Sequence, residues 1–217
     1  MPLAFIAALV VLFGLEYKTA FLETYLKGEW RVTEGKVALT FDDCPLEPYT
    51  SQILDTLAKH NLIATFFVIG ERAQKHPDVV KRIMDEGHSI GNHGYTDKRP
   101  SLLSEDATAD GIIQTQDILE NITSVRPTLF RLPSGIPRRD IKNVVDKENL
   151  RVIFAEVIIL NERQKTVDEI VSYIIKNTKS GSIILLHGDH SEVVKALPGI
   201  LLELKKYDLE FLTLERQ

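Results

Sequence analysis

Short apolar runs alternate with helical patterns from residue 36 to the end of the chain. The runs have the length and the β-branched and aromatic content of buried strands, and the segments between them repeat apolar residues at helical spacing. This alternation is typical of an α/β protein with a mainly parallel sheet. The pattern predicts strands at 37–41, 64–68, 89–92, 129–131, 151–155, 182–186 and 210–214, and helices at 50–60, 77–86, 105–121, 139–149, 167–176 and 192–206.

Two of the predicted helices carry a start signal. Thr166 is followed three residues later by Glu169, which forms a capping box, and Pro77 suits the first turn of its helix. The chain has no linker, repeat or low-complexity tract from residue 30 onward, so we expect 30–217 to form a single domain.

The predicted strands can close into a barrel or lie open as a doubly wound sheet. No glycine-rich phosphate loop follows any of them, which disfavours a nucleotide-binding sheet. A closed barrel and an open sheet both remain possible, and in a β/α barrel the functional residues gather at the carboxyl ends of the strands.

The N-terminal segment, residues 1–29, is separate in character. Its 13 residues from 3 to 15 carry no charge and are too few to span a bilayer alone. They are typical of the apolar region of a signal peptide, while a truncated membrane anchor and a helix packed on the domain are the alternatives. We expect an extracellular or membrane-anchored protein that contacts the membrane only through this segment.

The charge balance excludes one large class of partners. The chain has 26 basic and 31 acidic residues, a net charge of −5, and no basic run, so we expect no nucleic-acid partner. A single cysteine, Cys44, cannot form an internal disulfide, and nothing in the pattern predicts the oligomeric state.

The first strand runs directly into two carboxylates, Asp42 and Asp43, before Pro45 ends the ladder. Neighbouring side chains on a strand point to opposite sides, so these two are not expected to share one buried environment. Two like charges this close favour a bound cation or a shared proton, which suggests a metal ligand beside a general base. A polar turn after a strand is the alternative.

Polar residues also follow three other strands. His93 and Asp97 follow the third, Arg131 ends the fourth, and His187 ends the sixth. Because the carboxyl ends of parallel strands meet at one rim, these side chains are expected to converge with the two carboxylates.

Four segments of the chain together resemble the motifs of a known family. The segments Thr-Phe-Asp-Asp-Cys-Pro (40–45), Gly-Asn-His-Gly-Tyr-Thr-Asp (91–97), Phe-Arg-Leu-Pro-Ser-Gly (130–135) and Leu-Leu-His (185–187) look like the ordered motifs of polysaccharide deacetylases. These are the NodB-homology enzymes of carbohydrate esterase family four. The resemblance implies an α/β fold of the distorted (β/α)7 barrel type. It also implies that the protein uses a divalent metal, usually zinc, to remove N-acetyl groups from chitin-like or peptidoglycan-like sugars.

The resemblance also implies a role for each matching residue. Asp42 matches the general base, Asp43 a metal ligand, and His93 the first of two metal histidines. Arg131 matches the arginine that holds the base carboxylate, and His187 matches the general acid.

Several positions depart from the family pattern. Asp97 stands where the second metal histidine is found; it either ligates, in a harder site that admits manganese or cobalt, or is too short to reach. The backbone N–H of Ser134 matches an oxyanion donor without the family's aromatic side chain, and Tyr95 is the other candidate for substrate contact. Cys44 replaces a glycine, where its thiol is either accommodated or coordinates. Glu156 is the candidate for the carboxylate that tunes the catalytic histidine, in a segment that lacks the family's tryptophan.

We therefore expect a metal-dependent hydrolase of N-acetylated polysaccharides or oligosaccharides. One alternative is a catalytically inactive family member that binds glycan or is structural. The other is a metal enzyme that acts on a small non-glycan amide or acyl group.

Overall fold

The computed structural model describes residues 28–96, 104–133 and 139–216. The predictions made for the segment 1–27, for Asp97 and for Ser134 lie outside the described residues. Within the described ranges, no helix combines the length and the apolar character needed to cross a bilayer.

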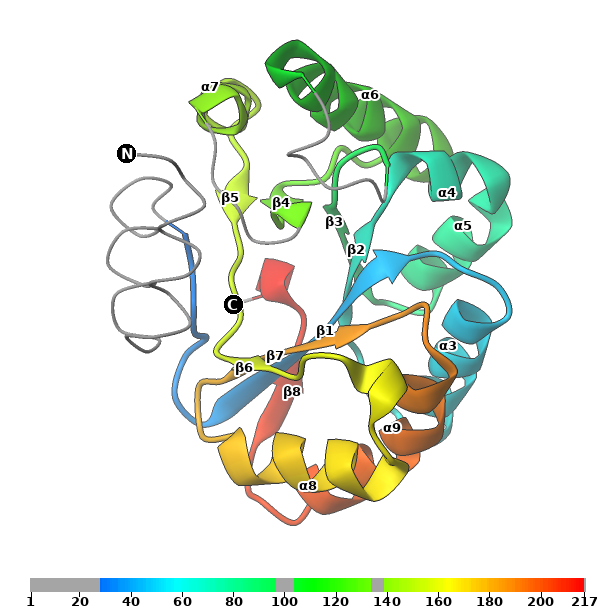
Figure 1. Cartoon of the computed structure of the whole chain (residues 1–217), viewed down its shortest axis with the longest axis vertical. Coiled ribbons are helices and arrows are strands. Elements are labelled where there is room, and N and C mark those ends of the chain that lie inside the picture. The colour runs from blue at the N-terminus through cyan, green and yellow to red at the C-terminus, as the bar shows by residue number, and fades with distance from the viewer. Residues whose placement is uncertain (1–27, 97–103, 134–138, 217) are drawn as a thin grey trace.

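The core of the fold is a curved, eight-stranded sheet with helices packed around its outer face (Figure 1). Its hydrogen-bonded order is β5-β4-β3-β2-β1-β7-β6, β8 pairs with β1, and all of these pairings are parallel. The strands are β1 (Lys36–Cys44), β2 (Thr65–Val68), β3 (Ser89–Asn92), β4 (Leu129–Phe130), β5 (Arg151–Val152), β6 (Val157–Ile158), β7 (Ile183–His187) and β8 (Glu210–Leu212).

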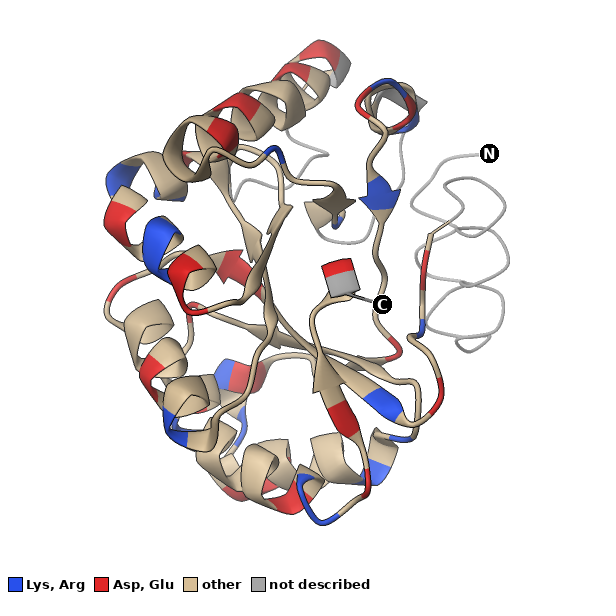
Figure 2. Cartoon of the chain, turned by 180° about the vertical axis from the view of Figure 1, so that it is seen from behind, with Lys and Arg blue, Asp and Glu red and all other residues tan. Residues whose placement is uncertain are grey.

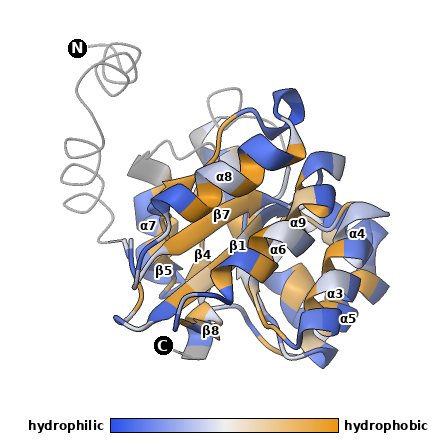
Figure 3. Ribbon diagram, turned by 90° about the horizontal axis from the view of Figure 1, so that it is seen from below, coloured by the Kyte–Doolittle hydropathy of each residue, from blue (hydrophilic) through white to orange (hydrophobic). Residues whose placement is uncertain are grey.

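The helices follow the strands along the chain and carry many charged residues, whereas the strands are largely apolar (Figures 2 and 3). They are α3 (Tyr49–His60), α4 (Gly70–Lys75), α5 (Pro77–Asp85), α6 (Glu105–Thr123), α7 (Arg139–Lys147), α8 (Val167–Asn177) and α9 (Ser191–Leu204), with single 3-10 turns η3 (Glu162–Gln164) and η4 (Leu214–Arg216).

This architecture confirms the predicted α/β barrel-type fold and differs from the prediction in detail. The capping box of Thr166 and Glu169 is present at the start of α8, and Pro77 opens α5. The apolar run predicted as one strand at 151–155 is a shorter strand, β5, followed by a separate strand, β6. The short helix α4 was not predicted, because six residues are too few to display a helical period.

Successive side chains of β1 point to opposite faces of the sheet, which determines which of them reach the barrel interior. Val37, Leu39 and Phe41 are buried against the helices, whereas Ala38 packs with the interior cluster on the other face. With a period of two, Thr40 and Asp42 also face the interior, at the carboxyl end of the strand.

A segment before β1 pairs with β5 and with the residues that follow it. The N–H of Glu29 donates to the carbonyl of Val152 at 2.8 Å, and the N–H of Phe154 donates to the carbonyl of Glu29 at 2.7 Å. Trp30 stacks on Phe154 with ring centroids 4.4 Å apart. These contacts tie the start of the domain to the sheet.

Candidate active site

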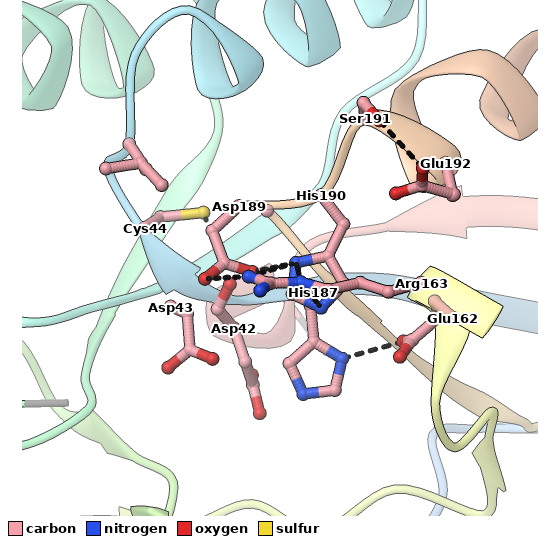
Figure 4. Close-up of polar contacts among 12 residues, drawn as sticks. Asp42, Asp43, Cys44, Glu162, Arg163, His187, Asp189, His190, Ser191 and Glu192 are labelled. Atoms are coloured by element: carbon pink, nitrogen blue, oxygen red, sulfur yellow. Dashed lines mark hydrogen bonds and ion pairs between the residues drawn. The ribbon is translucent and has the colours of Figure 1, made fainter. Parts of the chain in front are cut away.

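A β-bulge at the end of β1 brings two neighbouring carboxylates to one side of the strand. The register with β2 shifts between Phe41 and Cys44, and Asp43 has a left-handed φ of 60°. The extra residue cancels the alternation, so Asp42 and Asp43 both face the barrel mouth (Figure 4). The expectation that the two side chains point to opposite sides was wrong, because it assumed a regular strand. Asp42 is buried, whereas Asp43 is half-buried.

The imidazole of His93, at the end of β3, faces both carboxylates. Its Nε2 lies 3.5 Å from Oδ1 of Asp43 and 3.9 Å from Oδ2 of Asp42. Its Nδ1 lies 3.0 Å from the carbonyl oxygen of Arg131. A carbonyl oxygen can only accept, so Nδ1 is the donor and a neutral His93 presents a lone pair at Nε2.

This donor set fits a divalent metal. Two ligands bound at about 2 Å to a tetrahedral ion lie roughly 3.3 Å apart, close to the separation of Asp43 and His93. A histidine whose second nitrogen donates to a backbone carbonyl is the usual arrangement at metal sites. Burial raises the pKa of Asp43, and the charge of Asp42 raises it further against an opposing effect of His93. A cation between these groups removes that penalty.

Asp42 is held by a buried guanidinium. Nη1 of Arg131 donates to Oδ1 of Asp42 at 2.8 Å and to Oγ1 of Thr40 at 2.7 Å, and the Thr40 hydroxyl donates to the carbonyl of Ile184. The guanidinium also lies over the ring of Phe67, 4.1 Å from its centroid. Burial lowers the pKa of Arg131 and Asp42 opposes that effect, but an arginine stays charged in proteins. The pair therefore keeps an oriented carboxylate at the mouth of the barrel.

The imidazole of His187, at the end of β7, is paired with Glu162 of η3. Nδ1 of His187 lies 2.7 Å from Oε1 of Glu162, a carboxylate that is only 2% exposed (Figure 4). Burial lowers the pKa of His187, but the hydrogen bond and charge of Glu162, together with Asp42 and Asp43, outweigh it and raise the pKa to about 9. His187 is therefore held as a proton donor at neutral pH.

The prediction that Glu156 is the carboxylate beside this histidine was wrong. Glu156 forms ion pairs with Arg31 at 2.8 Å and Lys179 at 2.9 Å, and accepts a hydrogen bond from Ser182. The segment after β5 forms a further strand before it turns, which moves the functional carboxylate to Glu162. A sequence signal did exist, since Glu162 comes shortly after the second apolar run of this segment, at 157–160.

Tyr95 and Cys44 occupy different surroundings. The Tyr95 hydroxyl donates to Gln74 of α4 at 3.2 Å, and the residue lines a hollow of about 190 Å³ together with Phe130 and Pro133. The Cys44 thiol points away from the carboxylates and donates to the carbonyl of Asp42 at 3.6 Å (Figure 4). Burial raises the pKa of this thiol. Cys44 is thus accommodated rather than placed to coordinate a metal.

A second group of donor atoms lies beside the first. The ligand atoms of Glu162, His187 and His190 all lie within 4.8 Å of one another. The two rings are stacked, however, at 15° between planes and 5.5 Å between centroids, which does not direct both lone pairs to one point. Glu162 is already the partner of His187, so Asp43 and His93 form the better candidate metal site among the described residues.

Comparisons with known proteins show which family this chain is similar to. The family model described as polysaccharide deacetylase matches residues 30–153. A peptidoglycan-N-acetylglucosamine deacetylase of Bacillus cereus is 36% identical over 203 residues, which cover 92% of this chain and 71% of the relative. The crystal structure of a peptidoglycan N-acetylglucosamine deacetylase in complex with 4-naphthalen-1-yl-N-oxidanyl-benzamide superposes with a TM-score of 0.83 at 34% identity, over 91% of this chain and 94% of that one.

A further similar structure comes from a family member that lacks enzymatic activity in its natural form. It is a mutant of a carbohydrate esterase family four pseudoenzyme with restored enzymatic activity, at a TM-score of 0.79 and 27% identity, over 86% of this chain and 69% of that one. The same fold therefore carries both active and inactive members.

Proposed function

The chain belongs to the polysaccharide deacetylase family, and we propose that it is a metal-dependent hydrolase that removes N-acetyl groups from peptidoglycan-like glycans. One observation carries the proposal. A carboxylate held by Arg131 and an imidazole held by Glu162 lie at the ends of the adjacent strands β1 and β7, where Asp42 is in register with His187. A general base and a general acid at one rim are what hydrolysis of an unreactive amide requires.

Asp43 and His93 would hold the metal, and Asp97, outside the described residues, is the candidate third ligand. A divalent ion at this place would polarise the amide carbonyl and lower the pKa of a bound water. Zinc is the first choice for a site that contains histidine, and a carboxylate from Asp97 would widen the choice toward cobalt or manganese.

The protein groups divide the proton transfers between them. Asp42 accepts a proton from the attacking water while Arg131 holds that carboxylate in position. The water oxygen adds to the carbonyl carbon, and the carbon–nitrogen bond breaks as His187 gives its proton to the leaving nitrogen. The products are acetate and a free amine on the sugar. The backbone N–H of Ser134 remains the candidate donor to the developing oxyanion.

The names of two relatives support a proposed substrate class. The Bacillus cereus relative is named for N-acetylglucosamine in peptidoglycan, and a Bacillus subtilis relative for N-acetylmuramic acid in the same polymer. We propose an N-acetylated wall glycan as substrate for this chain, acted on outside the cell or at its membrane. Residues 1–29 would then provide the export signal or anchor.

The alternative is an inactive glycan-binding member of the family. Asp97 in place of a histidine and the pseudoenzyme among the similar structures favour it. The two hypotheses differ in turnover: the hydrolase releases acetate from N-acetylated chitooligosaccharide and loses that activity to a chelator, whereas the binder retains glycan without release. A small non-glycan amide as the only substrate that is cleaved would support the third hypothesis, a metal enzyme with a different substrate.

The variant Asp97→His separates an impaired site from a complete one. If the present site is impaired, this substitution raises both zinc affinity and acetate release by a large factor. If Asp97 already serves as a ligand, the gain is small.

A further inference from the structure

We propose that Arg72 and Asp189 form a positioning pair that fixes the bulge at Asp43 and thereby sets how tightly this site binds its metal. The inference rests on the proposed function, because it takes Asp43 to be a metal ligand. Neither Arg72 nor Asp189 belongs to the sequence motifs that carry the family resemblance.

The bulge needs support at one backbone group in particular. The carbonyls on either side of Asp43 are bound by backbone donors: that of Asp42 accepts from the N–H of Gly188 and that of Cys44 accepts from the N–H of Ile69, both at 2.8 Å. Asp43 is the extra residue of the bulge, so its carbonyl cannot join the sheet ladder. It therefore needs a donor from outside the ladder, either a side chain or a water molecule.

Arg72 provides that donor. Its Nη1 donates to the carbonyl oxygen of Asp43, and the same nitrogen lies 3.5 Å from Oδ2 of Asp189. Both side chains are largely buried, with 13% and 7% of their surface exposed. A guanidinium at this depth requires a carboxylate nearby, and Asp189 supplies it.

Asp189 in turn is fixed from several directions. It forms ion pairs with the neighbouring His190 and with Arg163 of η3, the latter at 3.7 Å. Asp189 lies two residues after His187, in the loop between β7 and α9. The Arg72–Asp189 pair therefore joins the bulge that carries the candidate metal ligand to the loop that follows the candidate acid (Figure 4 shows Asp189 above Asp43 and Asp42).

The consequence is a preorganised ligand. A non-glycine residue with φ of 60° is intrinsically disfavoured, and without the arginine the bulge is free to relax toward a regular strand. If the register of the strand shifts by one residue, the Asp43 carboxylate turns away from His93. Supporting groups of this kind typically change metal affinity by roughly 10–100-fold when removed.

The test is zinc affinity of the purified metal-free protein, measured by competition with a chromophoric chelator. Arg72→Met is expected to weaken zinc binding by roughly 10–100-fold, and Arg72→Lys, which keeps a charged donor, is expected to recover part of the loss. The absorption spectrum of the cobalt-loaded protein should change in Arg72→Met, because the ligand geometry changes. Arg82→Met is the matched control: Arg82 also bridges two carboxylates, Asp55 and Glu86, but lies on α5, and its loss should leave zinc affinity unchanged.

Asp189→Asn is the second variant and decides the matter if Arg72→Met does not fold. It keeps the shape of the side chain and removes its charge, so zinc binding should weaken several-fold, and Arg72→Met/Asp189→Asn should bind zinc no worse than Arg72→Met alone. Unchanged zinc affinity in Arg72→Met or in Asp189→Asn, an equal loss in Arg82→Met, or additive losses in the double variant would overturn the inference. A wild-type protein that binds no zinc contradicts the proposed function as well, whereas a wild type that binds zinc beside unaffected variants contradicts this inference alone.

Discussion

Glu162 and His187 form a carboxylate–imidazole pair, with 2.7 Å between Oε1 and Nδ1, although the two residues come from a 3-10 turn and a strand end that are 25 positions apart. Against the opposing effect of burial, the pair raises the pKa of His187 to about 9. An acid with this pKa is protonated at neutral pH, so activity should be retained below about pH 9 and lost as the pH rises through that value.

The first prediction concerns the substitution Glu162→Gln. It removes the charge that stabilises the imidazolium, so the alkaline limb of kcat/KM should move to lower pH and activity at neutral pH should fall. A pH–rate profile measures both effects. Glu156→Gln is the matched control, because Glu156 pairs with Arg31 and Lys179 and should leave the alkaline limb in place. Equal shifts in the two variants would show that Glu162 has no special relation to the acid.

The second prediction concerns the buried pair of Arg131 and Asp42. Arg131→Met leaves the Asp42 carboxylate buried without its partner, which should lower the free energy of unfolding by about 3–5 kcal/mol. Urea unfolding of the metal-free protein measures this. Arg131→Met combined with Asp42→Asn should be more stable than Arg131→Met alone, since no unpaired charge remains. A double variant less stable than the single one would show that the unpaired Asp42 carboxylate is not what destabilises Arg131→Met.

The third prediction concerns Gly188 and Cys44, which share one space. A Cβ at Gly188 would lie 2.2 Å from the sulfur of Cys44. Gly188→Ala should therefore lower the free energy of unfolding by about 1–3 kcal/mol through overpacking. Cys44→Gly removes the obstructing sulfur, so Gly188→Ala should cost less in that background. Thermal unfolding of the four proteins gives the comparison, and an equal cost in both backgrounds would place the strain elsewhere.

The strands of this fold can be predicted from the sequence, whereas the directions of the side chains in its site cannot. The apolar run of β1 and the positions of His93 and His187 after later runs are enough to place three elements of the site at one rim. The direction of Asp43 could not be predicted, because the bulge depends on pairing with β2 and on the donor from Arg72.

Two further residues escaped prediction for a similar reason. Glu162 escaped because the predicted strand ends at 155, so the apolar run at 157–160 that precedes Glu162 was not assigned as a second strand, β6. Asp189 is joined to Arg72 across 117 positions, and contacts of this range leave no periodic signal in a single sequence.

The central claim is that Asp42 and His187 catalyse amide hydrolysis at a metal site. Acetate release from N-acetylated chitooligosaccharide, measured for the wild type and Asp42→Asn at equal zinc occupancy and after chelation, tests it most directly. We predict steady release by the zinc-loaded wild type, loss of release on chelation with recovery on adding zinc back, and a decrease of at least roughly 100-fold in Asp42→Asn. Tight zinc binding by a wild-type protein that releases no more acetate than Asp42→Asn would contradict it.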